Sequence, residues 1–255
     1  MGKVLVAFSG GVDSAFLLHQ CLSALGRQAV TAVNIDHPLL APGEAEEAIR
    51  LAMEIGARIL SVNLDPLSLP EVSGNETTRC YHCKFLLFSR LRELAVQQDI
   101  PWLLDGTNAG DSEGTRPGMK ALEMLGVRSP LREAGLAKED VRAAAREAGL
   151  AVWDKPSSPC LATRFPYGET ITREDLIRVG KGEAVLRRCG FTDFRLRVHG
   201  EVARIEVLGN QAEMFFQSEI KNIIISDLKK LGYRFVTLDL EEFRSGSMDE
   251  GIIDK

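Results

Sequence analysis

The chain has 255 residues, of which 45% are hydrophobic, and a formal net charge of −5 at neutral pH. This length suits one large domain or two modest ones with a real apolar core. The negative net charge excludes a broadly basic surface that binds nucleic acid without sequence preference, while leaving room for a local basic patch. No apolar run is as long as a membrane span, and no signal peptide precedes the first predicted strand. We therefore expect a cytoplasmic protein with no membrane partner.

Strands and helices alternate through the first 150 residues. The apolar runs predict strands at residues 4–8, 29–35, 58–62 and 102–104. Helical spacing predicts helices at residues 14–25, 43–55, 84–97 and 137–148. This alternation is typical of the α/β class with a doubly wound parallel sheet, in which ligands bind at the carboxyl ends of the strands.

The pattern changes after Thr172. Helices are predicted at 173–188 and 211–231, an antiparallel strand pair at 194–198 and 203–207, and a last strand at 234–238. These elements indicate a smaller α+β domain at the C-terminal end. We therefore expect a first domain over residues 1–170 and a second over residues 171–255, with a polar tail from residue 241.

A glycine-rich motif, SGGVDS at residues 9–14, joins the first predicted strand to the first predicted helix. Gly10 and Gly11 permit positive φ and let backbone N–H groups approach an anion, and the helix adds its positive dipole end. Asp13 stands where the usual phosphate loop has a lysine, and a carboxylate suits Mg²⁺. The motif predicts a phosphate or pyrophosphate site; the alternative is a tight turn without a ligand.

Two further polar segments follow predicted strands. Asp36 follows the second strand, and the acidic, small-residue loop 105–111 follows the fourth. Because the carboxyl ends of parallel strands meet at one edge of the sheet, we expect these segments and the glycine motif to surround one crevice.

The chain has five cysteines, and in a reducing compartment they favour metal binding or catalysis over disulfides. Cys21 lies on a predicted helix among leucines, and Cys189 lies at a helix end before Gly190; both are expected to be small buried side chains. Cys80 and Cys83 form a C-x-x-C turn before a predicted helix, and Cys160 lies in a proline-rich loop. Three interpretations stay open for this trio: a 4Fe-4S cluster with one open iron, a persulfide or sacrificial cysteine, and a zinc site completed by a histidine.

Longer motifs give the chain a family resemblance. The loop around Cys160 has the sequence KPSSPCLATRFPYG at residues 155–168, and RLRVH follows at 195–199. With SGGVDS, RCYHCK at residues 79–84 and FRSG at residues 243–246, these motifs resemble the LarE family of the PP-loop ATP pyrophosphatases, nearly end to end. The fold implied is adenine nucleotide alpha hydrolase-like.

The resemblance implies an ATP-dependent sulfurtransferase. Its substrate is pyridinium biscarboxylic acid mononucleotide, whose carboxylates are adenylylated and then converted to thiocarboxylates for the nickel-pincer nucleotide cofactor of lactate racemase. In family members with one cysteine, the residue matching Cys160 donates its own sulfur. The presence of Cys80 and Cys83 matches the variant in which three cysteines carry a 4Fe-4S cluster, so we expect all three to be cluster ligands and to act in catalysis.

The resemblance also implies the other site residues. The phosphates of ATP and Mg²⁺ would lie at Ser9, Gly10, Gly11, Asp13 and Ser14. Further nucleotide contacts would come from Asp36, Gly106, Asn108 and Asp111. Arg195 and Arg197 alternate on one strand and share a face, which suits the phosphate of the substrate. Arg164 and Glu183 are further substrate-binding candidates; the alternative for all four is a solvated charge.

Other function classes remain as alternatives. A PP-loop tRNA thiolation enzyme also combines this loop with C-x-x-C and a later cysteine, but such enzymes tend to carry a basic surface. An amidotransferase-type synthetase needs no cysteine trio and no cluster, and a nucleotide-binding module would do no chemistry. The family forms homo-oligomers, which we carry over as an expectation; the sulfide source is unknown.

Overall fold

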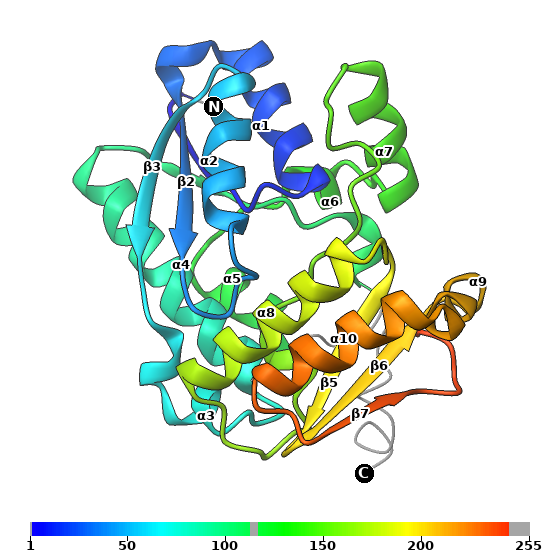
Figure 1. Ribbon diagram of the computed structural model, residues 1–255. Coiled ribbons are helices and arrows are strands. Elements are labelled where there is room, and N and C mark those ends of the chain that lie inside the picture. The colour runs from blue at the N-terminus through cyan, green and yellow to red at the C-terminus, as the bar shows by residue number, and fades with distance from the viewer. Residues whose placement is uncertain (1, 113–116, 245–255) are drawn as a thin grey trace. The chain divides into compact units, whose positions relative to one another are not determined.

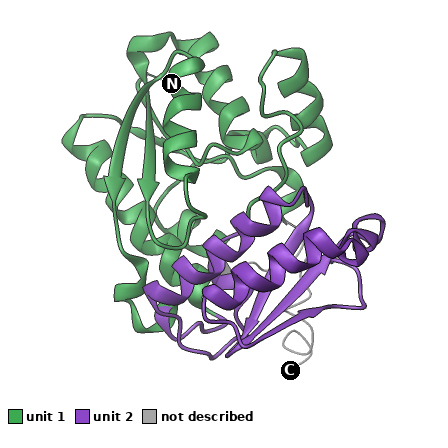
Figure 2. Cartoon of the chain, in the orientation of Figure 1, with its two compact units in different colours: residues 1–72, 78–158 green, residues 73–77, 159–255 purple. Residues whose placement is uncertain are grey.

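A computed structural model describes residues 2–112 and 117–244, which form two compact units (Figure 2). The first unit contains Met1–Val72 and Thr78–Ser158, and the second contains Ser73–Thr77 and Pro159–Lys255. The expected domain division after residue 170 stays a prediction. Within the described ranges, no helix combines the length and the apolar character needed to cross a membrane.

The first unit is built on a four-stranded parallel sheet (Figure 1). Its strands lie in the order β3-β2-β1-β4, and adjacent strands pair in parallel. Their bounds are β1 (Val4–Ala7), β2 (Val30–Asp36), β3 (Arg58–Asn63) and β4 (Trp102–Leu104). All four predicted strands are therefore present, and each differs from its predicted range by one residue at most per end.

Helices cover both faces of this sheet. Alternate residues of β1 point to opposite faces, so Val4 and Val6 enter one apolar cluster and Leu5 enters another. The first cluster includes side chains from α1 (Val12–Leu25), α2 (Glu44–Glu54) and α7 (Lys138–Glu147). The second includes Leu91 and Ala95 of α4 (Arg79–Gln97). A parallel sheet with helices on both faces confirms the α/β, doubly wound class.

Short elements complete the first unit. The polar segment after β3 forms a 3₁₀ turn and a short helix. These and the remaining elements are η1 (Arg27–Ala29), η2 (Pro66–Ser68), α3 (Pro70–Ser73), η3 (Ala109–Ser112), α5 (Pro117–Met124) and α6 (Pro130–Glu133).

The second unit contains a smaller, mixed sheet in the order β5-β6-β7. Strands β5 (Phe194–His199) and β6 (Val202–Val207) are antiparallel, as predicted, and β7 (Phe235–Leu238) pairs parallel to β6. Helices α8 (Arg173–Arg188) and α10 (Ser218–Lys230) contribute the buried residues Leu176, Leu186, Ile224 and Leu228. This unit has the α+β character that its sequence predicts.

Two helix predictions were wrong. The segment 211–231 is not one helix but α9 (Gly209–Ala212), η5 (Glu213–Phe216) and α10, because Gln217 adopts an extended backbone with ψ 115°. Phe215 packs on Phe191 with ring centroids 4.6 Å apart, and this tertiary contact outweighs the local helical spacing. The helix predicted to begin at residue 84 begins at Arg79, so the C-x-x-C residues lie within α4 rather than in a turn before it.

Candidate active site

The glycine motif forms a tight connection between β1 and α1. Ser14 Oγ donates to the carbonyl oxygen of Gly11 at 3.0 Å, and Ser9 Oγ lies 3.2 Å from Ser14 Oγ. Gly11 N donates to Ser9 Oγ at 3.4 Å. Gly11 is the N-cap residue of α1, with no side chain capping the helix. The first turn of α1 therefore begins at the loop where an anion is expected.

Gly10 is required for a different reason. Its φ is +77°, a conformation that side chains other than glycine rarely adopt. A Cβ at this position would lie 2.8 Å from Ala48 Cβ and 3.0 Å from Ala48 Cα on α2. Gly10 thus lets the loop pack closely against α2, and it is not among the described residues that line the cavities below.

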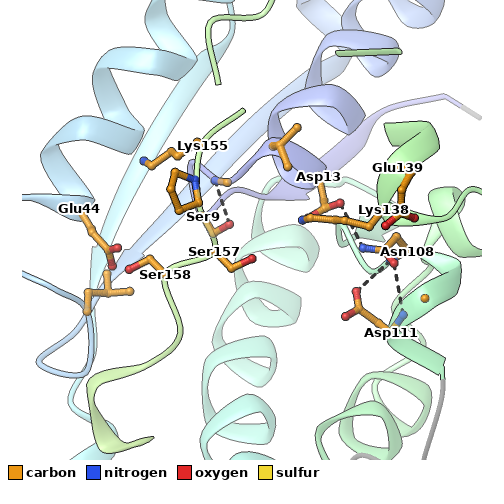
Figure 3. A pocket seen from close by; sticks show the side chains of 15 residues that line it. Ser9, Asp13, Glu44, Asn108, Asp111, Lys138, Glu139, Lys155, Ser157 and Ser158 are labelled. Atoms are coloured by element: carbon orange, nitrogen blue, oxygen red, sulfur yellow. Dashed lines mark hydrogen bonds and ion pairs between the residues drawn. The ribbon is translucent and has the colours of Figure 1, made fainter. Parts of the chain in front are cut away.

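The motif opens on a cavity of about 590 Å³ (Figure 3). The cavity is mostly lined by polar side chains that come from loops and helix starts of the first unit. They include Ser9, Asp13, Glu44, Asn108, Asp111, Lys138, Glu139, Lys155, Ser157 and Ser158. The strand ends β1 and β4 therefore meet around one space, as their parallel arrangement predicts.

Both carboxylate oxygens of Asp13 have partners in this cavity. One of them, Oδ1, accepts from Asn108 Nδ2 at 3.2 Å, and the other, Oδ2, forms an ion pair with Lys138 Nζ. Asn108 and Asp111 are tied to each other by two hydrogen bonds, in each of which a backbone N–H donates to a side-chain oxygen at 3.2 Å. The predicted residues Asp13, Asn108 and Asp111 thus form one connected group (Figure 3).

Several lining residues were missed by the sequence analysis. Lys138 and Glu139 were included only in the helix predicted at residues 137–148, and Ser157 and Ser158 only in the motif at residues 155–168. The basic residue at a helix start was the available signal, since lysine is unusual at the positive end of a helix dipole unless it has an acidic partner.

A second cavity, of about 310 Å³, shares Ser9, Gly11 and Asp13 with the first. Its walls are largely apolar and come from β1, β2 and α4. The lining side chains include Phe8, Val33, Ile35, Leu87, Phe88 and Leu91, with Ser14, Gly106 and Thr107 from the loops. A flat, apolar group next to the phosphate loop would fit this space.

Two polar side chains of the second cavity have unpaired atoms. Asn34 is buried and donates from Nδ2 to the carbonyl oxygen of Phe8 at 2.9 Å, whereas its Oδ1 has no partner among the described residues. His37 Nδ1 is also buried without a partner in that part of the chain. Burial lowers the pKa of His37 to about 4, although Asp36 and Asp65 act to raise it. Asp36 itself is exposed and is not among the described residues that line either cavity.

A buried carboxylate orders the loop after β4. Asp105 accepts from Ser129 Oγ at 2.5 Å and from the hydroxyl of Thr107. A Cβ on Gly106 would lie 2.9 Å from the backbone nitrogen of Ser14. Gly106 therefore permits the loop after β4 to touch the start of α1, and it lines the second cavity; its contact with a nucleotide stays a prediction.

The donors in the first cavity suit Mg²⁺ but do not form a complete site. No three His, Cys, Asp or Glu side chains within residues 2–112 and 117–244 gather closely enough to hold a metal ion by themselves. Mg²⁺ usually takes one or two carboxylates and completes its shell with water and substrate phosphates. Asp13 and Asp111 line the same cavity and offer such carboxylate oxygens.

The three predicted catalytic cysteines lie in two units. Cys80 is exposed and Cys83 is partly exposed, one turn apart near the start of α4 in the first unit. Cys160 is exposed in the second unit, where it precedes the turn η4 (Leu161–Arg164). Thiolates are soft ligands that iron accepts, so Cys80 and Cys83 offer a donor pair and Cys160 a third thiol.

The remaining two cysteines are not among the described residues that line either cavity. Cys21 belongs to the apolar core of the first unit, as predicted, and burial raises its pKa to about 11. Cys189 is partly buried at the end of α8, and burial also raises its pKa.

Arg164 and Glu183 form a buried ion pair. Their side chains are each 2% exposed, and Arg164 Nε donates to Glu183 Oε1 at 2.7 Å. Arg164 also donates to Thr163 Oγ1 at 2.7 Å and to the carbonyl oxygen of Pro159 at 3.3 Å. Thr163 in turn donates to the carbonyl oxygen of Cys160 from both its N–H and its hydroxyl. These two predicted substrate ligands therefore hold the turn next to Cys160, and their direct contact with substrate stays a prediction.

The two strand arginines have different surroundings. Arg197 is buried, donates from Nε to Glu206 at 3.0 Å, and donates from Nη1 to the carbonyl oxygen of Thr163 at 2.8 Å. Arg195 is partly buried, with its guanidinium 4.5 Å from the ring centroid of Phe243. Burial, and then the nearby Arg164, lower the pKa of Arg195 to about 10. The end of the FRSG motif, residues 245 and 246, lies outside the described residues.

Comparisons with known proteins give partial and nearly complete matches. The NAD synthase family model matches residues 1–82. A GMP synthase of Porphyromonas gingivalis is 32% identical over 41% of this chain and 21% of its own length. An uncharacterized protein of Synechocystis is 39% identical over 98% of this chain and 92% of its own length. The pyridinium-3,5-bisthiocarboxylic acid mononucleotide synthase of Lactiplantibacillus plantarum is 40% identical over 97% of this chain and 89% of its own length.

The short matches each cover less than half of the chain. The long match, by contrast, covers nearly the whole chain and therefore reaches into both units. The chain therefore belongs to the LarE family, the enzyme family of the pyridinium-3,5-bisthiocarboxylic acid mononucleotide synthase, with a PP-loop nucleotide fold.

Proposed function

We propose that this chain is an ATP-dependent sulfurtransferase that converts the two carboxylates of pyridinium biscarboxylic acid mononucleotide to thiocarboxylates. The single observation that carries the proposal is the glycine loop with Asp13 on a polar cavity of about 590 Å³. The chain that presents this cavity is 40% identical to a synthase named for the bisthiocarboxylic product. The product would serve the nickel-pincer nucleotide cofactor of lactate racemase.

The proposed chemistry begins with activation of a poor electrophile. A substrate carboxylate oxygen attacks the α-phosphorus of ATP, and pyrophosphate leaves from the opposite side. The N–H groups of the glycine loop and the start of α1 bind the phosphates, and the carboxylates of Asp13 and Asp111 bind Mg²⁺. The apolar second cavity takes the adenine, next to the phosphate loop. Ser9, Gly11 and Ser14 line one or both spaces, which supports this assignment.

Sulfur replaces the activated oxygen in the second step. A sulfur nucleophile adds to the acyl carbon, and AMP leaves with the bridging oxygen, so that a thiocarboxylate remains. We propose Cys80, Cys83 and Cys160 as the sulfur-handling residues. When bound to the three thiolates, a 4Fe-4S cluster would supply an open iron for inorganic sulfide. Without a cluster, Cys160 would be the sacrificial donor.

Iron content tests the sulfur-handling part of the proposal. Protein purified without oxygen is analysed for iron and acid-labile sulfide, and its visible absorbance is compared with that of Cys80→Ala, Cys83→Ala and Cys160→Ala. Loss of iron in all three variants supports the trio, and unchanged iron in any variant removes that residue. A mass loss of one sulfur and two hydrogens at Cys160 after turnover would instead indicate the sacrificial route.

Pyrophosphate release tests the activation step independently. We expect pyrophosphate and AMP from ATP only when the pyridinium substrate is present, and we expect Asp13→Asn to abolish both. Release that is independent of the pyridinium compound would overturn the substrate assignment.

A second candidate is an amidotransferase-type synthetase without a cluster. The family match to NAD synthases and the partial match to GMP synthases favour it for the first unit. Ammonia-dependent AMP formation with a colourless, iron-free protein would support this candidate.

Assembly and compartment complete the proposal. We propose a homo-oligomer, by analogy with the family, and a cytoplasmic setting, because thiols that bind iron or donate sulfur require reducing conditions. Light scattering of the purified chain tests the first of these expectations.

A further inference from the structure

Asp13, whose carboxylate is proposed to bind the metal ion of the nucleotide site, forms an ion pair with Lys138. Lys138 Nζ contacts Asp13 Oδ2, and Asn108 Nδ2 donates to Asp13 Oδ1 at 3.2 Å. The Asp13 and Lys138 side chains are 20% and 33% exposed, so the pair faces the cavity and is accessible from it. Both oxygens of Asp13 are therefore engaged by side-chain donors of the chain itself (Figure 3).

The two ends of this ion pair come from fixed elements. Asp13 lies in the first turn of α1, and Lys138 is the first residue of α7. Val141 and Ala145 anchor α7 in the same apolar cluster as the buried face of α1. Since the helices are fixed by packing, the flexible part is the four-carbon stem of Lys138.

A divalent cation and an ammonium in contact with the same carboxylate oxygen repel each other. A cation that binds alone at Asp13 therefore either meets this repulsion or displaces Lys138 and leaves its charge without a partner in the cavity. A nucleotide changes this balance, because its phosphates offer several negative oxygens to the same ammonium. Once Lys138 moves to the phosphates, Asp13 is available to the cation.

We propose that Lys138 controls metal loading at Asp13. In the nucleotide-free chain its ammonium occupies the metal position, and the incoming triphosphate draws it away and admits the cation. The inference rests on the proposed use of ATP at this cavity. It assigns to Lys138 a positioning role through Asp13 and a direct contact with the phosphates.

The consequence is a thermodynamic coupling between two ligands. Each of the two ligands must raise the affinity for the other by the same factor. We expect this factor to be about tenfold or more, within the range of typical coupling free energies.

Manganese provides the probe. Mn²⁺ binding is measured by electron paramagnetic resonance, with and without α,β-methylene ATP, whose α–β bridge cannot be cleaved. In the unmodified chain we expect weak Mn²⁺ binding alone and binding at least about tenfold tighter with the nucleotide. In Lys138→Met we expect tighter binding of Mn²⁺ alone and a smaller coupling factor than in the unmodified chain, because only direct coordination of Mn²⁺ by the phosphates then remains.

Two variants control for charge and folding. Lys155 lines the same cavity but pairs with Glu47 at 3.1 Å, so Lys155→Met removes a positive charge without releasing Asp13. It should keep the coupling factor of the unmodified chain. Lys138→Arg keeps a cation beside Asp13 and should retain most of the coupling, which separates a loss of contact from a loss of fold.

The outcomes distinguish the inference from the function. If the unmodified chain binds the nucleotide but Lys138→Met shows the same coupling, the role of Lys138 is wrong and ATP use stands. An equal gain in Mn²⁺ affinity in Lys138→Met and Lys155→Met would show a general charge effect and also overturn the inference. If the unmodified chain binds no ATP analogue in the presence of Mn²⁺, the proposed function itself fails.

Discussion

At Gly10 the backbone and its neighbour leave no room for a side chain. The positive φ would strain the backbone of any other residue at this position. An added Cβ would also lie only 2.8 Å from Ala48 Cβ. Gly11, one position later, has φ −82°, and a Cβ there would meet only Ser9 Oγ, at 3.6 Å. The two adjacent glycines therefore have different roles, the first in packing and the second in leaving the loop open to a ligand.

This difference gives a matched pair of substitutions. Gly10→Ala should lower the free energy of unfolding by about 1–3 kcal/mol, because it adds backbone strain and pushes the loop away from α2. Gly11→Ala should leave the fold intact and weaken ATP binding. Thermal unfolding with and without ATP checks both, and equal melting temperatures for Gly10→Ala and the unmodified chain would contradict the packing argument.

His37 makes folding sensitive to acid. Its pKa is lowered by burial from 6.5 to about 4, so below pH 6.5 the unfolded chain takes up a proton that the folded chain refuses. The free energy of unfolding should therefore decrease as the pH falls from 6.5 to 4, and it should be about 2 kcal/mol lower at pH 5 than at neutral pH. Below pH 4, His37 should cause no further decrease. In urea unfolding, the free energy of unfolding should drop less between pH 7 and pH 5 in His37→Gln than in the unmodified chain. An identical drop in the two proteins would refute the assignment to His37.

Much of the nucleotide site could be predicted at the scale of single residues. Asn108 and Asp111 follow one strand and Asp13 follows another, and the sheet brings strand ends together wherever the strands are parallel. Lys138 and Ser157 could not be predicted in the same way. A lysine at a helix start indicates an acidic partner, but which partner Lys138 meets depends on how α7 packs on α1, and the place of Ser157 depends on where the following loop runs.

At the scale of elements, the turn next to Cys160 rests on buried charge. Arg164 connects helix α8, through Glu183, to the backbone at Pro159 and to the hydroxyl of Thr163. Arg197 of β5 reaches the carbonyl oxygen of Thr163 as well. A helix and a strand therefore fix the backbone that presents an exposed thiol, and buried charges of this kind are costly to leave unpaired.

Arg164→Met should destabilise the chain by roughly 3–5 kcal/mol, because it leaves the carboxylate of Glu183 buried without its main partner. The double replacement Arg164→Met with Glu183→Leu should recover part of this loss. Arg188→Met is the control, because Arg188 lies on α8 like Glu183 but is 63% exposed and pairs with Asp227 near solvent. Chemical unfolding of the four proteins compares them, and a stable Arg164→Met protein would show that the pair contributes little.

Regular elements were predicted better than interrupted ones. The bounds of α8 agree with the prediction at both ends, since Thr172 caps it with an Asp175 box that the local sequence specifies. The segment 211–231 misled the prediction, because its apolar spacing is helical while Phe215 is held against Phe191. Tertiary contacts between distant aromatic residues carry no local signature.

At the scale of the whole molecule, the net charge of −5 disfavours non-specific binding of nucleic acid. We expect no shift of total tRNA in a gel at salt concentrations from low to physiological, because few counterions would be released on contact. A shift that weakens steeply with salt would favour the tRNA thiolation alternative. A protein of this charge with an added basic tail serves as the positive control.

The two units are interleaved along the chain. Ser73–Thr77 belongs to the second unit although residues on both sides belong to the first. Within it, Asn75 is fully buried and donates to the carbonyl oxygens of Phe165 and Pro166, and the N–H of Ile171 donates to the carbonyl oxygen of Ser73. A fragment that ends at residue 158 would keep residues 73–77 but would lose their hydrogen-bond partners at Phe165, Pro166 and Ile171. Neither unit can therefore be expressed or exchanged as one uninterrupted segment of chain. A fusion protein that exchanges the second unit would have to exchange residues 73–77 as well.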